Sequence, residues 1–434
     1  MLTSITIKDF KSYRDATLRL APLTVLIGAN ASGKSNAIEA LRLLSWIAQG
    51  NRVTAIRYAA YEGDQAVRGT TASLPYREIN AFTLAATISE EEWDTFSITL
   101  ARSEDADLHI ADERIVATKG TTVPLYEVVG RSEGAGSDLR VAYNNFARGG
   151  RKPQVACNDQ MAILLQLQSS ARFEAGHKVA QTTIPEVCKR YQEILSNTLF
   201  LDPQPSAMRG YAFKAEHRLR GDGGNLSGVL FNLCQDESSK TEILNLIRSL
   251  PEQNIRSLKF IETPRGEVMV ELEETFGGKN WRFDAPLLSD GTLRVLSIAA
   301  AILSASPGSL VAIEEIDNGV HPSRAKMLLS SVSAIAKRRA LRVLITSHNP
   351  ALLDALPNDA VPNVVFCYRD PQDGTSRLIR LQDVSDYPEL IAQGSIGHLM
   401  TTGVMERFVK FHPGPKARRR KAREWLQSLR SATE

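Results

Sequence analysis

Long apolar runs are missing from this sequence, and that absence excludes a class of proteins. No window approaches 18 uninterrupted apolar residues, so we expect no membrane-spanning helix and no membrane partner. The N-terminal segment carries early charges and has no apolar stretch, which predicts that it is not a secretory signal.

Cysteine is scarce, and heptad repeats are absent. The four cysteines, Cys157, Cys188, Cys234 and Cys367, have no spacing that is typical of a zinc site or a redox dithiol. A reducing, cytoplasmic location is therefore expected. No long stretch has the heptad pattern of a coiled coil, so a protein built around a long helical arm is not expected.

A strong overall charge is also lacking. The 434 residues carry a net charge of +3, yet residues 416–423, KARRRKAR, alone hold six basic side chains. Removing those six charges leaves the remainder at about −3. The body of the chain is therefore not a general nucleic-acid binder by charge, and only the tail has that character.

What the sequence does contain is a regular succession of apolar patterns. From residue 288 onward, strands alternate with helices, which predicts a parallel sheet with helical crossovers. The elements expected before that point, in chain order, are a hairpin at 3–19, a buried strand at 23–27, a helix at 35–49, an antiparallel sheet region at 80–146, amphipathic helices at 157–197, a strand at 197–203, two helices between 225 and 250, and a hairpin at 257–276.

Residues 28–35, GANASGKS, fit the phosphate-loop pattern G-x-x-x-x-G-K-[ST] and stand between an expected strand and an expected helix. Glycines allow successive backbone N–H groups to face phosphate oxygens, and the start of the helix adds its positive end. Lys34 is predicted to reach the β- and γ-phosphates, and Ser35 to bind Mg²⁺, so ATP and Mg²⁺ are the predicted cofactors. The predicted nucleotide-binding residues of this loop are Gly28, Ala29, Asn30, Ala31, Ser32, Gly33, Lys34, Ser35 and Asn36.

A second site follows the expected strand at 310–313. Glu314 and Glu315 emerge at its end, and phosphoryl transfer needs a carboxylate beside the metal and a group that orients the attacking water. We predict that Glu314 binds Mg²⁺, directly or through water, and that Glu315 polarises the nucleophilic water.

Two further pieces narrow the class of protein. Ser289, Asp290 and Gly291 stand immediately before an expected helix, where free N–H groups and a hydroxyl form an anion site. Such a site is redundant within one chain but suits the γ-phosphate of ATP held by a second copy. His348 follows the strand ending at Ser347 and is predicted to contact the γ-phosphate or water, although taken alone it would fit a neighbour of a helix cap.

These four pieces, in this order, resemble the ABC-type ATPase heads of the RecF, SMC and OLD families. The resemblance covers most of the chain and is greatest to compact OLD-like bacterial ATPases of the AAA type that lack a Toprim nuclease domain. It implies Walker A at 28–35, the ABC signature at 289–292, Walker B and the catalytic glutamate at Glu314 and Glu315, a D-loop around 317–321, and His348 as the switch histidine.

The fold that the resemblance implies is an α/β P-loop NTPase with a mixed central sheet, an antiparallel β lobe and a helical insert. The expected divisions are an ATPase at 1–402, with its core at 1–50 and 275–402, its β lobe at about 51–150 and its helical insert at about 151–274, followed by a basic tail or helix at 403–434.

The sequence departs from the family pattern in ways that keep every ligand. Glu314 replaces the usual aspartate, the signature reads Ser-Asp-Gly instead of Ser-Gly-Gly, and Ile316 and Asp317 replace proline and glutamate. The Q-loop glutamine stays open among Gln154, Gln160, Gln166 and Gln168.

Nuclease chemistry is not expected in this chain. Only 86 residues follow His348, too few for a Toprim domain with its connections, and the acidic run at 104–107 reads as a solvated turn.

The basic tail leaves three interpretations open. Its cations can bind phosphate backbones of DNA or RNA, or an acidic partner, or they can form a solvated helix that packs Trp425 on the body. The possible nucleic-acid contacts are Lys416, Arg418, Arg419, Arg420, Lys421 and Arg423.

The leading hypothesis for function is an ATP-driven switch that forms a homodimer, or a higher homo-oligomer, by sandwiching ATP. By resemblance, such a switch acts with a separately encoded nuclease or toxin in bacterial antiphage defence. A RecF-like DNA-repair ATPase is one alternative. The other is a scaffold that binds ATP, hardly hydrolyses it and holds a toxic partner inactive.

Overall fold

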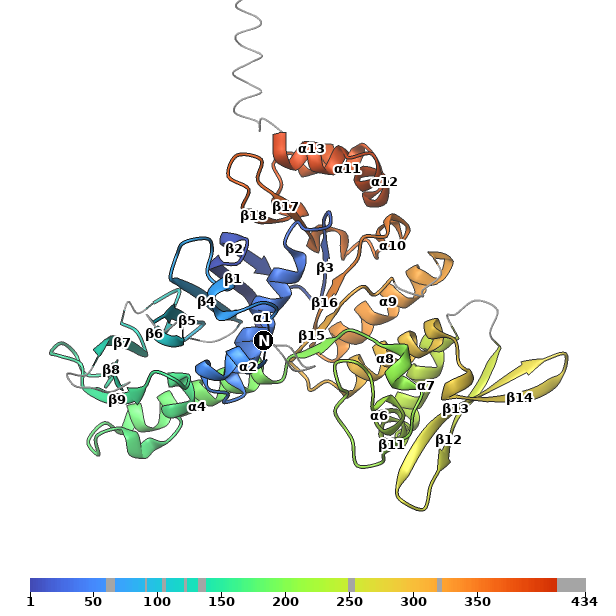
Figure 1. Cartoon of the computed structure of the whole chain (residues 1–434), viewed down its shortest axis with the longest axis horizontal. Coiled ribbons are helices and arrows are strands. Elements are labelled where there is room, and N and C mark those ends of the chain that lie inside the picture. Colours follow the sequence, from blue (N-terminus) through green and yellow to red (C-terminus); the bar gives the residue numbers. More distant parts are fainter. Residues whose placement is uncertain are drawn as a thin grey trace, which may run out of the picture.

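The computed structural model describes residues 1–59, 67–89, 92–103, 107–120, 123–131, 138–248, 254–317 and 322–411. Figure 1 shows a central sheet in the middle of the molecule, an antiparallel sheet at the left, a third sheet with its helices at the lower right, and the C-terminal helices at the top. Two apolar cores accompany this arrangement, one on each side of the central sheet.

The central sheet has the strand order β10–β15–β16–β3–β17–β18. Its strands run parallel except β18, which is antiparallel to β17, so the predicted mixed sheet is confirmed. The bounds of its strands are β3 (Leu23–Ile27), β10 (Leu199–Leu201), β15 (Leu310–Ile313), β16 (Arg342–Thr346), β17 (Val364–Arg369) and β18 (Ser376–Arg380).

Strand β3 shows why the centre of this sheet is built from uninterrupted apolar residues. All five of its residues are buried, as are all four of β15. Leu23, Val25 and Ile27 join one core, whereas Leu26 joins the other, because successive side chains of a strand point to opposite faces. A strand covered on both faces has no solvent side on which a polar residue could alternate.

Helices cover both faces of the central sheet. Helix α1 (Lys34–Ala48) begins inside the P-loop, as predicted, and buries Ile38, Leu41, Leu44 and Ile47 along one face. The other helices of the ATPase core are α8 (Asp290–Ser304), α9 (Pro322–Arg338), α10 (Pro350–Asp354), α11 (Tyr387–Ala392), α12 (Ile396–Thr401) and α13 (Val404–Phe411).

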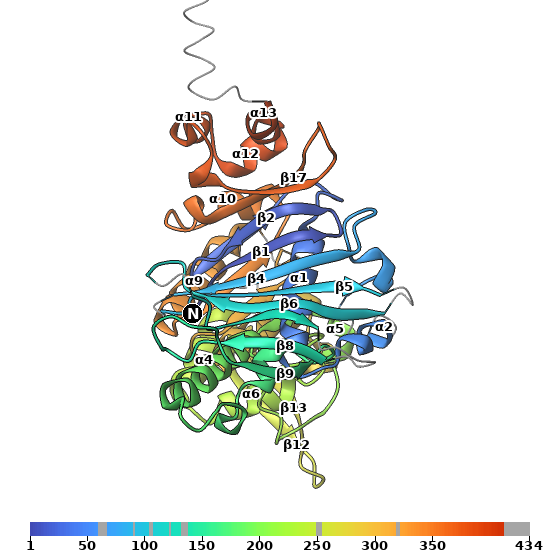
Figure 2. The same ribbon diagram turned by 90° about the vertical axis from the view of Figure 1, so that its left-hand side faces the viewer.

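The antiparallel sheet has the order β2–β1–β4–β5–β6–β7–β8–β9, and Figure 2 shows it facing the viewer. The hairpin predicted at 3–19 is confirmed as β1 and β2, but it belongs to this sheet and not to the central one. The reason is the buried face of the hairpin, where Ile5, Ile7 and Leu18 pack with Leu84. The bounds are β1 (Leu2–Phe10), β2 (Tyr13–Arg19), β4 (Ala81–Ile88), β5 (Thr95–Arg102), β6 (Leu108–Val116), β7 (Tyr126–Arg131), β8 (Asp138–Tyr143) and β9 (Gln154–Asn158).

The helices predicted across 157–197 form only in part. Strand β9 extends to Asn158, and the helices are α3 (Ile163–Gln166) and α4 (Lys178–Ser196). Over MAILLQLQ, residues 161–168, only the central four residues are therefore helical. Glu113 of the neighbouring sheet caps it by accepting hydrogen bonds from the backbone N–H groups of Ile163 and Leu164.

The segment predicted as a helical insert, 151–274, also contributes strands. Strand β10 joins the central sheet, and a third sheet has the order β11–β13–β12, with β14 pairing β13. The other described elements of this region are α5 (Pro205–Met208), β11 (Ala212–Phe213), α6 (Leu226–Leu233), α7 (Glu237–Ile247), β12 (Ile255–Glu262) and β13 (Glu267–Phe276). Strand β14 (Lys279–Asp284) follows it, and the short helix α2 (Ile56–Ala59) lies near the N-terminal end of the chain.

Three predicted segments lie wholly or mostly outside the described residues. The predicted tail begins with α13, but its basic residues at 416–423 lie outside the described residues, as does most of the acidic run at 104–107 and of the predicted D-loop. None of the helices in the described ranges is long and apolar enough to cross a bilayer.

Candidate ATP-binding site

One cavity of about 350 Å³ gathers the predicted catalytic groups. It lies where β3, β15 and β16 end, because the carboxyl ends of parallel strands meet at the same edge of a sheet. Lys34, Glu314, Glu315 and His348 all line it. The P-loop side of the wall consists of Asn30, Ala31, Gly33, Lys34, Ser35 and Asn36.

The remaining P-loop residues face a second cavity. Gly28, Ala29 and Ser32 line a neighbouring space of about 390 Å³, which residues of α12 and α13 also line. His348 borders both spaces. The P-loop is therefore the wall between the two cavities.

Glycine is required at two positions of the P-loop. Backbone φ is +149° at Gly28 and +120° at Gly33, values that side-chain-bearing residues rarely adopt. A Cβ atom at Gly28 would overlap the carbonyl oxygen of Cys367, and one at Gly33 would overlap the side chain of Ser376. The loop can curl in this way only with glycine at both positions.

Lys34 lies against the loop that precedes it. Its Nζ donates to the carbonyl oxygens of Gly28 at 2.8 Å and Ala29 at 3.0 Å. Burial lowers the pKa of Lys34 from its ordinary value, an effect that the negative charge of nearby Glu315 opposes. The ammonium group is therefore held at the cavity wall, within reach of an anion placed in the cavity.

Side chains from three other segments brace the P-loop, and the sequence analysis missed them. The hydroxyl of Tyr13 donates to the Gly33 carbonyl at 3.0 Å. The Ser32 carbonyl accepts from the Ser376 hydroxyl and from the Cys367 thiol, and Arg369 Nε donates to the Ala31 carbonyl at 3.1 Å. These contacts fix the curl from the β1–β2 hairpin and from the β17–β18 hairpin.

The two glutamates differ in their surroundings. Arg42 of α1 donates to Glu314 Oε1 at 3.0 Å. Burial raises the pKa of Glu314, and the Arg42 charge opposes that rise. Glu315 has φ of +48°, and its backbone N–H donates to Thr346 Oγ1 at 2.9 Å. This turn directs Glu315 toward His348, whose Nε2 lies 3.7 Å from Glu315 Oε1.

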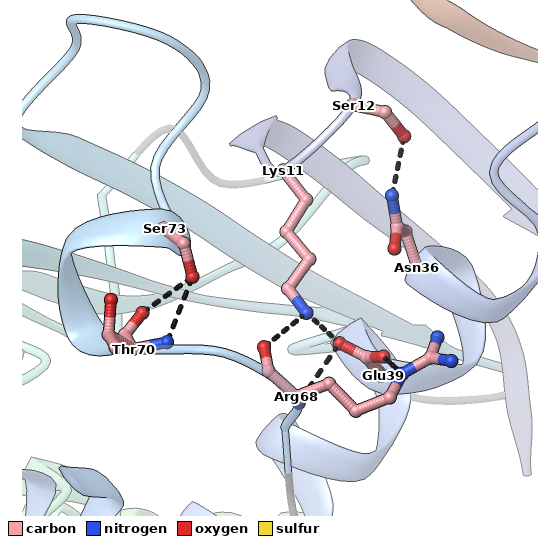
Figure 3. Close-up of polar contacts among 7 residues, drawn as sticks. All are labelled: Lys11, Ser12, Asn36, Glu39, Arg68, Thr70 and Ser73. Atoms are coloured by element: carbon pink, nitrogen blue, oxygen red, sulfur yellow. Dashed lines mark hydrogen bonds and ion pairs between the residues drawn. The ribbon is translucent and has the colours of Figure 1, made fainter. Parts of the chain in front are cut away.

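A cluster beside the cavity brings in a cation that sequence reasoning did not select (Figure 3). Glu39 of α1 is 6% exposed and pairs with both Lys11 and Arg68. Lys11 Nζ also donates to the Arg68 carbonyl at 2.8 Å. The sequence offered one signal of this cluster: Glu39 lies on the apolar face of the predicted helix, and a buried acid needs a cation as its partner. Arg68 lines the same cavity as Lys34.

The predicted signature residues lie outside this cavity. Ser289 caps α8 by accepting a hydrogen bond from the Thr292 backbone N–H at 3.1 Å. Asp290 is exposed and pairs with Arg209 at 2.6 Å. Neither residue, nor Gly291, lines either space beside the P-loop. The structure therefore does not bring the signature and the P-loop of one chain together.

The donor set suits magnesium held together with a polyphosphate. Ser35 and Glu314 line the same cavity, and Mg²⁺ in such sites takes one or two protein oxygens, phosphate oxygens and water. Within the described ranges, no group of three or more His, Cys, Asp or Glu side chains could hold a metal by itself. The arrangement can bind a phosphate chain through its amides and cations and polarise water through Glu315.

Comparison with known proteins gives two family matches. Residues 163–354 match the family described as "AAA domain, putative AbiEii toxin, Type IV TA system", and residues 1–112 match an AAA ATPase domain. A 57-residue segment is 46% identical to the DNA replication and repair protein RecF of Gloeobacter violaceus (strain ATCC 29082 / PCC 7421). That segment is 13% of this chain and 14% of the RecF chain, so it spans only a small part of that relative.

Solved structures of SMC heads are also similar. An SMC head bound to the C-winged helix domain of ScpA matches with 12% identity and a TM-score of 0.48, covering 87% of this chain and 97% of that one. The SMC head of Thermotoga maritima matches with 14% identity and a TM-score of 0.42, covering 87% and 98%. The strand order, the P-loop at the end of β3 and the two family matches together support a nucleotide-dependent ATPase fold of the AAA/ABC class.

Proposed function

We propose that this chain is an ATP-hydrolysing switch in which two copies enclose ATP and separate after hydrolysis. The observation that carries the proposal is the division of the predicted groups. Lys34, Glu314, Glu315 and His348 line one cavity, whereas Ser289 stands exposed at the start of α8, outside it. A site that needs both sets is completed by a second copy.

Each residue at the cavity has a role that follows from its position. Lys34 and the amides of residues 28–35 would hold the β- and γ-phosphates. Ser35 and Glu314 would hold Mg²⁺, which neutralises charge that develops on the phosphates. Glu315 would accept a hydrogen bond from the attacking water and orient it in line with the γ-phosphate. Arg68 would add positive charge from the side wall.

His348 would act together with Glu315. Their side chains lie 3.7 Å apart, and both are about half exposed to the cavity. An imidazole at this distance can restrict the rotamer of the carboxylate and sense an occupied γ-phosphate position. The alternative for His348, a neighbour of a helix cap, also fits this position, because the next residue, Asn349, accepts the capping bond from the Ala351 N–H at 3.0 Å.

The biological role that we propose is regulation of a separately encoded effector in bacterial antiphage defence. The description of the family matched by residues 163–354, which refers to a toxin, supports this role, as does the OLD-like pattern of motifs. The RecF segment favours a second candidate, an ATPase that acts on DNA during repair.

ATP turnover with and without duplex DNA tests the proposal and separates the candidates. We expect the purified chain to hydrolyse ATP, and Lys34→Ala to abolish the activity while the fold, followed by circular dichroism, is kept. Turnover that ignores DNA supports the effector switch, and turnover that DNA stimulates supports the repair ATPase. A wild-type chain that binds ATP but does not hydrolyse it contradicts the proposal and supports a nucleotide-dependent scaffold.

A further inference from the structure

The second residue of the signature motif carries a negative charge that phosphates would repel. Asp290 is the first residue of α8, and about two-thirds of its side chain is exposed. A carboxylate there stabilises the positive end of the helix. The same charge opposes the approach of a polyphosphate to that helix end, which is where the proposed function places the ATP of a second copy.

Arg209, from a distant part of the sequence, forms an ion pair with Asp290. It follows the short helix α5, and one of its terminal nitrogens forms an ion pair with Asp290 Oδ1 at 2.6 Å. The guanidinium is a permanent cation, so it offsets the negative charge of the Asp290 carboxylate. Arg209 and Asp290 are separated by 81 positions in the chain, and the fold brings them together.

The other terminal nitrogen of Arg209 holds the segment that leads into the signature. It donates to three carbonyl oxygens of that segment, those of Ala285 at 3.3 Å, Pro286 at 2.7 Å and Leu288 at 2.8 Å. Residues 285–287 form a single turn of 3₁₀ helix, and Leu288 connects this turn to Ser289. One side chain therefore sets the path of the backbone that presents Ser289 and cancels the charge of Asp290.

Arg209 is also connected to the carboxylate edge of the central sheet. The chain reaches Arg209 from β10 through α5, and β10 pairs in parallel with β15, the strand that Glu314 follows. Figure 1 shows α8 beside α6 and α7, on the side of the molecule away from the sheet that contains β1 and β2. Strand β10 thus connects both regions, because it pairs with the strand before Glu314 and leads to Arg209.

We propose that Arg209 is a positioning residue that makes the start of α8 acceptable to the phosphates of ATP bound by a second copy of this chain. The inference rests on the proposed function and adds to it a residue outside the recognised motifs. It also accounts for the Ser-Asp-Gly sequence, because Asp290 is tolerated where its charge is neutralised by Arg209. If Arg209 had a purely structural role, it would stabilise the loop before α8 without affecting the rate of ATP hydrolysis.

Variants at Arg209 distinguish the two roles. We expect Arg209→Ala to lower kcat for ATP hydrolysis by about tenfold or more, while ATP binding to the isolated chain is unchanged, because the chain's own P-loop is untouched. Arg209→Lys keeps the charge without the planar fork and should retain intermediate activity. In Arg209→Ala combined with Asp290→Gly, removal of the repelling charge should restore part of the lost turnover. Arg265→Ala, in the exposed turn between β12 and β13, is the matched control and should behave as wild type.

Mixing two inactive variants tests whether Arg209 acts on the other copy. A dimer of one Lys34→Ala chain and one Arg209→Ala chain contains one site with an intact P-loop and an intact signature. Equal amounts should recover roughly a quarter of wild-type turnover, since random pairing makes half of the dimers mixed and half of their sites intact.

The outcomes separate this inference from the function on which it rests. Hydrolysis by Arg209→Ala at the wild-type rate contradicts the role of Arg209 alone, as does a mixture no more active than its two components. If Arg209→Ala fails to fold, Arg209→Lys in the same mixture decides the question. A wild-type chain without any turnover contradicts the proposed function and the inference together.

Discussion

Glu113 gives the antiparallel lobe a stability that depends on pH. This side chain is fully buried in β6 and accepts hydrogen bonds from the Tyr126 hydroxyl at 2.8 Å and from the backbone N–H groups of Ile163 at 2.9 Å and Leu164 at 2.7 Å. Burial raises its pKa from 4.5 to about 7, although those three hydrogen bonds favour the ionised form. The carboxyl group thus connects the sheet to the start of α3.

The direction of the effect follows from proton binding. Between pH 4.5 and about 7 the folded chain holds a proton on Glu113 that the unfolded chain has released. The stabilisation is therefore complete below pH 4.5, decreases through this window and is lost above pH 7. A shift of this size corresponds to about 3 kcal/mol in the free energy of unfolding. Tyr126 and Cys188, which lie nearby, have pKa values raised well above their ordinary values, so they stay neutral throughout the window.

Glu113→Gln cannot titrate and isolates this contribution. We expect the free energy of unfolding of the wild type, minus that of the variant, to fall by about 3 kcal/mol between pH 4.5 and a pH above 7. Urea titrations followed by circular dichroism across this range provide the measurement, with Glu127→Gln on the next strand as the control. A difference that stays constant with pH, or that grows as pH rises, would refute the reasoning.

Three further predictions concern the P-loop and the tail. Lys34→Ala should weaken ATP binding about 10- to 100-fold in calorimetry, because a charge-assisted contact worth about 1.5–3 kcal/mol is lost, and unchanged affinity would contradict the P-loop assignment. Gly33→Ala should destabilise the chain by about 1–3 kcal/mol, since a side chain there needs a strained φ and overlaps Ser376; a melting temperature equal to that of the wild type would rule out this conformation. Deletion of 416–434 should reduce the retention of DNA, and the dependence of that retention on salt, if the six cations contact phosphates. Equal retention by the truncated chain would contradict a DNA contact of the tail and favour the solvated alternative.

Local pattern was sufficient to predict the parts of the site that stand at strand ends. The apolar stretch at 23–27 and the glycines that follow it predict a strand, a loop and a helix, and all three form. The placement of Glu314, Glu315 and His348 beside the loop follows from a general property of parallel sheets, since their strands end at one edge. No long-range contact had to be known for either prediction.

The missed residues are those that only tertiary contacts bring to the site. Arg68 pairs with the buried Glu39 beside the cavity, and Arg209 pairs with Asp290 of the signature across 81 positions of sequence. Cys367 and Ser376 brace the P-loop from the other end of the chain. Neither periodicity nor motif spacing reports such pairs. The same limit explains the start of the 157–197 region, where the pattern predicted helix but residues 157 and 158 pair with β8 as the end of β9.

ATP-dependent association of Glu315→Gln tests the central claim most directly. The variant keeps the groups that bind ATP but lacks the carboxylate that orients water, so an enclosed nucleotide should not be released. With ATP and Mg²⁺, sedimentation should show a species of twice the chain mass that disappears when ATP is omitted. A variant that binds ATP and remains a monomer at every concentration tested would contradict the account.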